Sequence, residues 1–156
     1  MKNTPKTALD ICNLALKKLG EAPIDSISWN GNLPSRLCYN HYHPERRETL
    51  CARRWDFAQR VVTLKGGSPF RLPDDCLRIQ NVSTTGWTLQ GQNIYAAHAS
   101  EIRLTYTADI EDVEQFSADF IEAFTLKLAA KMCIPLLRST TMAVQLRTEY
   151  AILIKN

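Results

Sequence analysis

The chain has 156 residues, of which 45% are hydrophobic and 22% are charged, and its formal net charge at pH 7 is +3. This length and composition are those of an ordinary globular protein that can bury a sizeable core. The positive excess is too small to indicate a dedicated DNA-binding protein. No apolar run is long enough for a membrane span or a signal-peptide core, so we expect a protein made in a cytoplasm that stays soluble.

Five cysteines are spread along the chain, and no two of them form a Cys-x-x-Cys pair. A structural zinc site is therefore not expected, because such sites use closely spaced cysteine and histidine pairs. Most of the cysteines lie among apolar neighbours, so we interpret them as small buried thiols in a reducing compartment. The five are Cys12, Cys38, Cys51, Cys76 and Cys133.

Two helices are predicted in the N-terminal third of the chain. Apolar residues at helical spacing predict a helix over about 8–19, with Thr7 as its N-cap and Gly20 just after its end. A loop with two prolines and a glycine follows, and a second helix is expected over about 35–54. Pro44 lies inside this helix and should kink it, because proline removes a backbone donor and crowds the preceding turn.

The remainder of the chain changes from strands back to helices. Residues 57–107 hold short strand-like runs separated by glycine-containing turns, a pattern typical of an antiparallel meander or small barrel. Helices are expected over about 117–137 and 139–154, and the first is apolar nearly all round, so protein should surround it. The predicted fold is α+β, a bundle of about four helices with a small antiparallel β-sheet or barrel inserted between helices two and three. We expect a single domain over 1–156.

Candidate catalytic and metal-binding residues are sparse. His41 and His43 are two positions apart, and on a helix such a pair points in different directions and chelates a metal poorly. The acidic run from Asp109 to Glu114 precedes a predicted helix, where the helix dipole already explains negative charge. Cys51 lies near several arginines, but no base that would activate it is suggested. We therefore expect no enzyme activity, no cofactor and no metal site.

Four segments are informative in their order: ALDICNLALKKLGEAPI, LCYNHYHPERRETLCARRWDFAQR, FRLPDDCLRI, and IRLTYTADIEDVEQFSADFIEAFTLKLAAKMCIPL. They contain a helix ending in Leu-Gly, a Tyr-x-Pro-x-x-Arg helix leading into Trp-x-Phe-Ala, a Leu-Pro-x-Asp-Cys-Leu-Arg turn, and an Asp-…-Phe-…-Phe helix. This order resembles the tail tubular protein A family, the head–tail adaptor proteins of short-tailed bacteriophages and related prophages. The matching positions are Tyr42, Pro44, Arg47, Trp55, Phe57, Ala58, Leu72, Pro73, Asp75, Cys76, Leu77, Arg78, Asp112, Phe116 and Phe120.

The resemblance implies a virion structural protein, a connector subunit that docks beneath the portal ring, extends the DNA channel and supports tail attachment. Its implied partners are the portal protein, other tail or nozzle proteins, and copies of itself in a ring that is dodecameric on the particle. The resemblance is also compatible with isolated subunits that stay monomeric until the portal provides a template for ring assembly. DNA would pass through without sequence readout, and no membrane is involved. The implied location is the head–tail junction of the virion, and the host cytoplasm during assembly.

Two departures from the family pattern stand out. Arg54 occupies the position before Trp55 where proline is common in the family, which should lengthen the second helix. The chain ends with YAILIKN, so a long C-terminal extension that grips the portal is not expected.

Four arginines of the second predicted helix share about a third of its circumference, around Leu50, if the helix is unbroken. They are Arg46, Arg47, Arg53 and Arg54. One interpretation is a solvated face with local ion pairs. The other is a surface that contacts a second subunit or the portal, because arginine is enriched at interfaces. The alternative function is a non-enzymatic DNA-binding accessory protein that uses the Arg-rich segment 46–60 on phosphates.

The candidate structural core consists of aromatic and aliphatic residues from the second and third predicted helices and from the segment that joins the second helix to the strands. Trp55 is expected to be largely buried where the helix gives way to the β region. The candidates are Tyr42, Trp55, Phe57, Phe120, Phe124 and Leu128.

Overall fold

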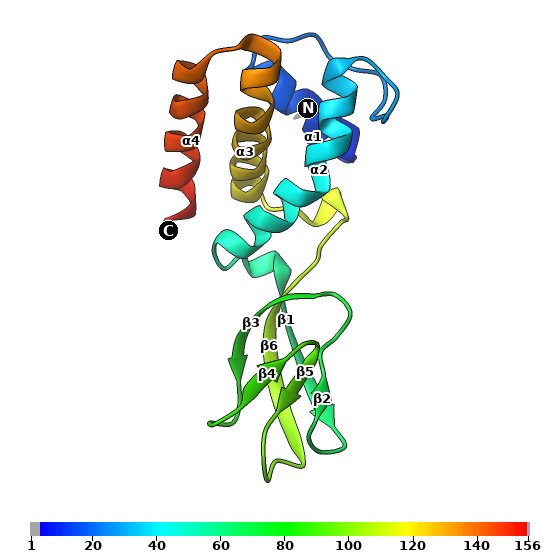
Figure 1. Cartoon of the computed structure of the whole chain (residues 1–156), viewed down its shortest axis with the longest axis vertical. Coiled ribbons are helices and arrows are strands. Elements are labelled where there is room, and N and C mark those ends of the chain that lie inside the picture. Colours follow the sequence, from blue (N-terminus) through cyan, green and yellow to red (C-terminus); the bar gives the residue numbers. More distant parts are fainter. Residues whose placement is uncertain (1–3, 156) are drawn as a thin grey trace. The chain divides into compact units, whose positions relative to one another are not determined.

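The computed structural model of the chain describes residues 4–155. Within that range it has four α-helices, and two small antiparallel sheets are inserted between the second and third helices (Figure 1). The predicted α+β class is therefore confirmed. Contacts divide the chain into two compact units, where the length had predicted a single domain. The helical unit comprises the residues up to Arg53 and from Glu111 onward, and the β unit comprises Arg54–Ile110.

Helix α1 spans Ala8–Lys18 and begins where the sequence predicted. The Thr7 side chain accepts a hydrogen bond from the Asp10 backbone N–H at 3.1 Å, and the Asp10 carboxylate accepts one from the Thr7 N–H at 3.1 Å. This reciprocal pair satisfies two backbone donors that a helix start leaves without partners. At the other end Gly20 has a φ of +73°, the left-handed conformation that favours glycine after a helix.

Helix α2 spans Leu33–Ala52, so it begins and ends two residues earlier than predicted. The Asn32 side chain accepts a hydrogen bond from the Ser35 N–H at 3.1 Å, which caps the helix before the predicted start. Pro44 lies inside the helix, and the ribbon of α2 changes direction about half-way along its length (Figure 1). Arg53 is already extended, with φ −158° and ψ 178°, so Arg54 does not lengthen the helix as the family departure had suggested.

Helices α3, Ala118–Leu137, and α4, Thr140–Ile154, complete the helical unit. Helix α3 contacts α1, α2 and α4, which explains why it is apolar nearly all round. The Tyr42 and Phe124 rings are 5.2 Å apart between centroids, and Phe120 and Phe124 are 5.7 Å apart. Tyr42, Phe120, Phe124 and Leu128 are all buried, as predicted.

The β unit is built from two three-stranded antiparallel sheets. The first has the order β1-β6-β3 and the second β2-β5-β4, so two small sheets replace the predicted meander or barrel. Their strands are β1 Gln59–Lys65, β2 Phe70–Arg71, β3 Cys76–Val82, β4 Thr88–Gln90, β5 Asn93–Tyr95 and β6 Glu101–Ala108. Two short 3-10 helices, Asp56–Ala58 and Val113–Gln115, lie just before β1 and between β6 and α3.

The turn before β3 is fixed to the end of β6 by hydrogen bonds. The Asp109 N–H donates to the Asp75 carbonyl at 2.7 Å, and the Tyr106 hydroxyl donates to the Asp75 carboxylate at 2.9 Å. Burial, with a smaller effect of this hydrogen bond, raises the pKa of Tyr106 to about 12. The Leu-Pro-x-Asp-Cys sequence therefore has a structural role inside the β unit.

The two aromatic residues that open the β unit differ in burial. Trp55 is only 2% exposed, as predicted, whereas Phe57 is half-buried and is not a full member of the core. Among residues 4–155, no helix is long and apolar enough to cross a membrane.

Candidate interaction surface

Arg46 is not a surface residue, which corrects the prediction made for it. Its side chain is completely buried. The Arg46 Nε donates a hydrogen bond to His43 Nδ1 at 3.2 Å, and its Nη2 lies 3.7 Å from Glu111 Oε1. Leu50, the centre of the predicted arginine face, is also buried. The centre of the face that the sequence assigned to solvent or a partner therefore points into the helical unit.

Arg53 and Arg54 do not share that face either, because α2 has ended before them. Arg53 donates to the Leu153 carbonyl at 3.1 Å and to the Asp119 carboxylate at 2.9 Å, so it links the end of α2 to α3 and α4. Arg54 is exposed and belongs to the β unit. Arg47 is the one residue of the predicted set that is both helical and exposed.

The outward face of α2 is formed by a different set of residues. Arg36, Asn40, His43 and Arg47 are all exposed and follow one another at spacings of three or four residues, so they lie along one side of the helix. Leu33 precedes this row and Tyr39, whose residue is 53% exposed, flanks it. Both are large apolar side chains that the fold leaves in solvent.

Trp29 lies in the loop that precedes α2. It is 70% exposed, the highest exposure of any large hydrophobic residue within 4–155. Its loop is held against the first turn of α2, because the Ser28 N–H donates to Ser35 Oγ at 2.9 Å and Ser35 Oγ donates to the Ser26 carbonyl at 2.6 Å. At Gly31 a Cβ atom would lie 2.8 Å from Ser35 Oγ, so the loop needs glycine there.

We call this set the α2 surface. Tryptophan, tyrosine and arginine are the residue types that contribute most to protein–protein binding energy. Exposed aromatic side chains beside cations also form stacking and phosphate contacts with single-stranded nucleic acid. The arrangement can therefore bind a macromolecule. The α2 surface comprises Trp29, Leu33, Arg36, Tyr39, Asn40, His43 and Arg47.

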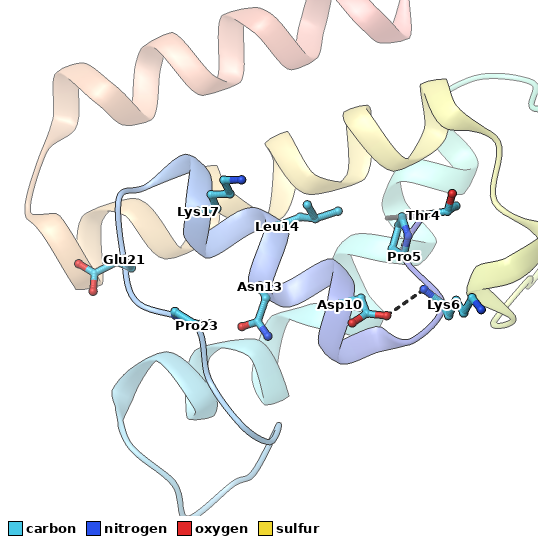
Figure 2. A pocket seen from close by; sticks show the side chains of 9 residues that line it. All are labelled: Thr4, Pro5, Lys6, Asp10, Asn13, Leu14, Lys17, Glu21 and Pro23. Carbon is cyan, nitrogen blue, oxygen red and sulfur yellow. Dashed lines mark hydrogen bonds between the residues drawn. The ribbon is translucent and has the colours of Figure 1, made fainter. Parts of the chain in front are cut away.

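A hollow of about 530 Å³ lies along the outer side of α1 (Figure 2). Two of its polar side chains, Asp10 and Asn13, already hydrogen-bond with the backbone. The Asp10 carboxylate accepts the Lys6 N–H at 2.9 Å, and these backbone hydrogen bonds lower the Asp10 pKa. The Asn13 amide donates to the Ile24 carbonyl at 3.1 Å and accepts its N–H at 2.8 Å. Its lining is Thr4, Pro5, Lys6, Asp10, Asn13, Leu14, Lys17, Glu21 and Pro23.

The other candidate ligands are placed as follows. Across residues 4–155, no three His, Cys, Asp or Glu side chains come close enough together to hold a metal ion. His43 uses Nδ1 to accept the hydrogen bond from Arg46, which orients its ring. In the acidic run, Asp112 caps the short helix Val113–Gln115 by accepting the Glu114 N–H at 3.0 Å.

Sequence reasoning missed Trp29, Leu33, Arg36 and Tyr39. The polar spacing of Arg36, Asn40, His43 and Arg47 is a readable signal for a solvent-facing row. Trp29 has no such signal, because an irregular loop has no periodicity.

Comparison with known proteins does not assign the chain to a group. No family model matches the chain, and no curated protein matches it. The resemblance to the tail tubular protein A family stays a prediction that rests on the order of its motifs.

Proposed function

We propose that the chain is a virion structural protein, a head-to-tail connector subunit that docks beneath a portal ring, extends the DNA channel and supports tail attachment. The observation that carries this proposal is the α2 surface, where exposed Trp29 and Tyr39 accompany two exposed arginines. In this proposal the surface binds a neighbouring subunit or the portal. The mechanism is assembly and sealing, with no bond chemistry.

The motif residues behind the resemblance fall into two groups, those that maintain the fold and those that are exposed for contact. Tyr42 and Trp55 are buried, and the Asp75 carboxylate accepts a hydrogen bond from the Tyr106 hydroxyl, so these residues maintain the fold. Arg47 belongs to both the motif and the α2 surface. In a connector, the buried motif residues would stabilise the subunit, and the exposed Arg47 would contact a neighbouring protein.

Ring assembly makes such a surface effective. In a closed ring each subunit presents the same patch to the next subunit, so a small contact energy is repeated around the ring. A stable interface buries about 800 Å² on each partner, and a few central aromatic and arginine residues supply most of its energy. Trp29, Tyr39 and Arg36 are the residues that we expect at that centre.

The alternative is a non-enzymatic DNA-binding accessory protein, and one observation favours it. Trp29 and Tyr39 could stack on bases while Arg36 and Arg47 contact phosphates, as in proteins that bind single strands. The arginines of segment 46–60 fit this role less well, because Arg46 is buried and Arg53 is paired with Asp119. Such binding would weaken steeply with salt.

The test is a double charge reversal, Arg36→Glu with Arg47→Glu. The control is Lys65→Glu with Arg103→Glu, which makes the same change of charge at exposed positions of the β unit. Both double variants should fold, because exposed substitutions usually change stability by no more than about 0.5 kcal/mol each. Each is assayed for melting temperature, for salt-dependent DNA binding, and for completion of portal-containing particles.

We expect the α2 variant to fold and to fail in particle completion, while the control completes particles. Like charges set against a complementary surface cost several kcal/mol, which is enough to block assembly. An α2 variant that still completes particles would contradict the interface role of this surface. If that variant completes particles but loses DNA binding, the result supports the alternative function of a DNA-binding accessory protein.

A further inference from the structure

A small cavity between α3 and α4 brings three basic side chains together. Its volume is about 130 Å³, and the buried Ala130 lines it. All of its residues belong to the helical unit, and none belongs to the α2 surface. The lining consists of Lys127, Ala130, Lys131, Arg147 and Tyr150.

The two lysines are only partly neutralised by carboxylates of α2. Lys127 Nζ lies 3.3 Å from Glu48 Oε1 and 3.7 Å from Glu45 Oε1, and Lys131 Nζ lies 3.8 Å from the same Glu45 oxygen. The Glu45 side chain is only 4% exposed, and its Oε1 makes no hydrogen bond with any described residue. The ammonium groups, with three N–H donors each, therefore keep donors for another acceptor.

Arg147 adds a third cation that the fold does not neutralise. It is exposed at the cavity, and within residues 4–155 it forms no ion pair or hydrogen bond. The lining thus carries three cations, of which only the two lysines lie within 4 Å of a carboxylate, Glu45 or Glu48, so the positive charge is in excess by one. A guanidinium has a planar set of donors that matches a carboxylate or phosphate.

Tyr150 provides a wall of the cavity. Lys127 Nζ lies 5.0 Å from the centroid of its ring, within the range of a cation–π contact. Burial raises the pKa of Tyr150. The half-buried ring and the lysine above it both line the cavity.

We propose that this cavity binds one small oxyanion of the phosphate class, with Arg147 and Lys131 as its main donors. A cavity of about 130 Å³ has room for a tetrahedral oxyanion. The excess positive charge sets the sign of the ligand. The inference does not depend on the connector proposal.

The test uses the whole chain and inorganic phosphate as the probe. Phosphate binding is measured by isothermal titration calorimetry, and the melting temperature is compared in phosphate and chloride at the same pH and ionic strength. We expect phosphate to raise the melting temperature above its value in chloride, because a ligand that binds the folded state stabilises it. Equal melting temperatures together with no calorimetric binding would overturn the proposal.

Matched variants locate the binding. Arg147→Gln should weaken phosphate binding at least about tenfold, a loss of about 1.4 kcal/mol. Arg103→Gln, which removes the same charge from an exposed position of the β unit, should leave the affinity unchanged. Glu48→Gln removes a competing carboxylate and should tighten binding. Equal losses for the two arginine variants, or weaker binding by Glu48→Gln, would show that the phosphate is not held in this cavity.

Discussion

The two units of the molecule bury different kinds of side chain. In the helical unit, α2 carries a buried carboxylate, Glu45, and a buried guanidinium, Arg46, whereas the charged residues described in the β unit stay at least partly exposed. The buried polar groups of the β unit are uncharged, such as Thr107 and the hydroxyl of Tyr106. The β unit is thus organised by alternation of apolar and polar residues, while the helical unit also depends on charges that meet inside it.

This contrast predicts which substitutions should strongly reduce the stability of the fold. A charge buried with partners is costly to reverse, and a large aromatic in a core is costly to remove. The same residue types on the surface should tolerate change. The chain offers pairs of residues of the same type, one buried and one exposed, that allow this difference to be measured.

The largest effect is expected for Arg46→Glu. The new carboxylate would be buried beside Glu111 with no compensating cation in the place of Arg46, and we expect a loss of about 3–5 kcal/mol in the free energy of unfolding. Arg47→Glu, one position later and exposed, should cost no more than about 0.5 kcal/mol. Urea denaturation of both variants measures the difference, and similar losses would mean that Arg46 is not buried.

Trp55→Ala should follow, with a loss of about 3–4 kcal/mol. Trp55 is 2% exposed, and deleting a core aromatic leaves a cavity. Trp29→Ala is the matched control in the helical unit, and it should change stability by less than about 0.5 kcal/mol because Trp29 is 70% exposed. Thermal denaturation followed by circular dichroism tests both, and a loss under about 1 kcal/mol for Trp55→Ala would contradict its burial.

Tyr106→Phe should have a smaller effect that depends on pH. Losing the hydrogen bond to Asp75 should cost about 1 kcal/mol at neutral pH. The pKa of Tyr106 is about 12 in the folded chain, against about 10 when unfolded, so between these values the folded state binds more protons. The stability of the unsubstituted chain should therefore fall as pH rises from about 10 to 12.

The variant checks that this pH dependence belongs to Tyr106. Tyr106→Phe lacks the titrating group, so its stability should fall less over the same pH range. Denaturant titrations of both chains at several alkaline pH values give the comparison. Parallel losses in the two chains would assign the pH dependence to other groups.

The smallest effect is expected from a metal chelator. Because residues 4–155 bring together no cluster of metal-binding side chains, EDTA should leave the melting temperature of the chain unchanged. Differential scanning calorimetry with and without the chelator is the measurement. A lower melting temperature would bring back the His41 and His43 pair, or the Asp109–Glu114 run, as a metal site.

Much of the fold could be predicted, because its signals are local. Thr7, Asp10 and Gly20 mark the ends of α1 through short-range capping, and the apolar sequence of α3 indicates a helix surrounded by protein. Pro44 marks the bend in α2. The number of sheets and the split into two units depend on long-range pairing, which no local pattern determines.

The candidate surface could be predicted only in part. Placing Arg53 and Arg54 on α2 required the helix to continue past Ala52, and the extended backbone at Arg53 ends it. The burial of Arg46 depends on Glu111, which is distant in the sequence, and on the direction in which α2 packs. The loop that carries Trp29 is held by the hydrogen bond from Ser28 to Ser35, which also forms only in the folded chain.

Composition analysis of completed virions tests the central claim most directly. Particles would be purified from cells in which the chain carries a small tag, and cryo-electron microscopy would examine the head–tail junction. The account predicts the tagged chain in every completed particle, as a closed ring beneath the portal, with the α2 surface covered by a neighbouring protein. Completed, infectious particles that lack the chain would contradict it.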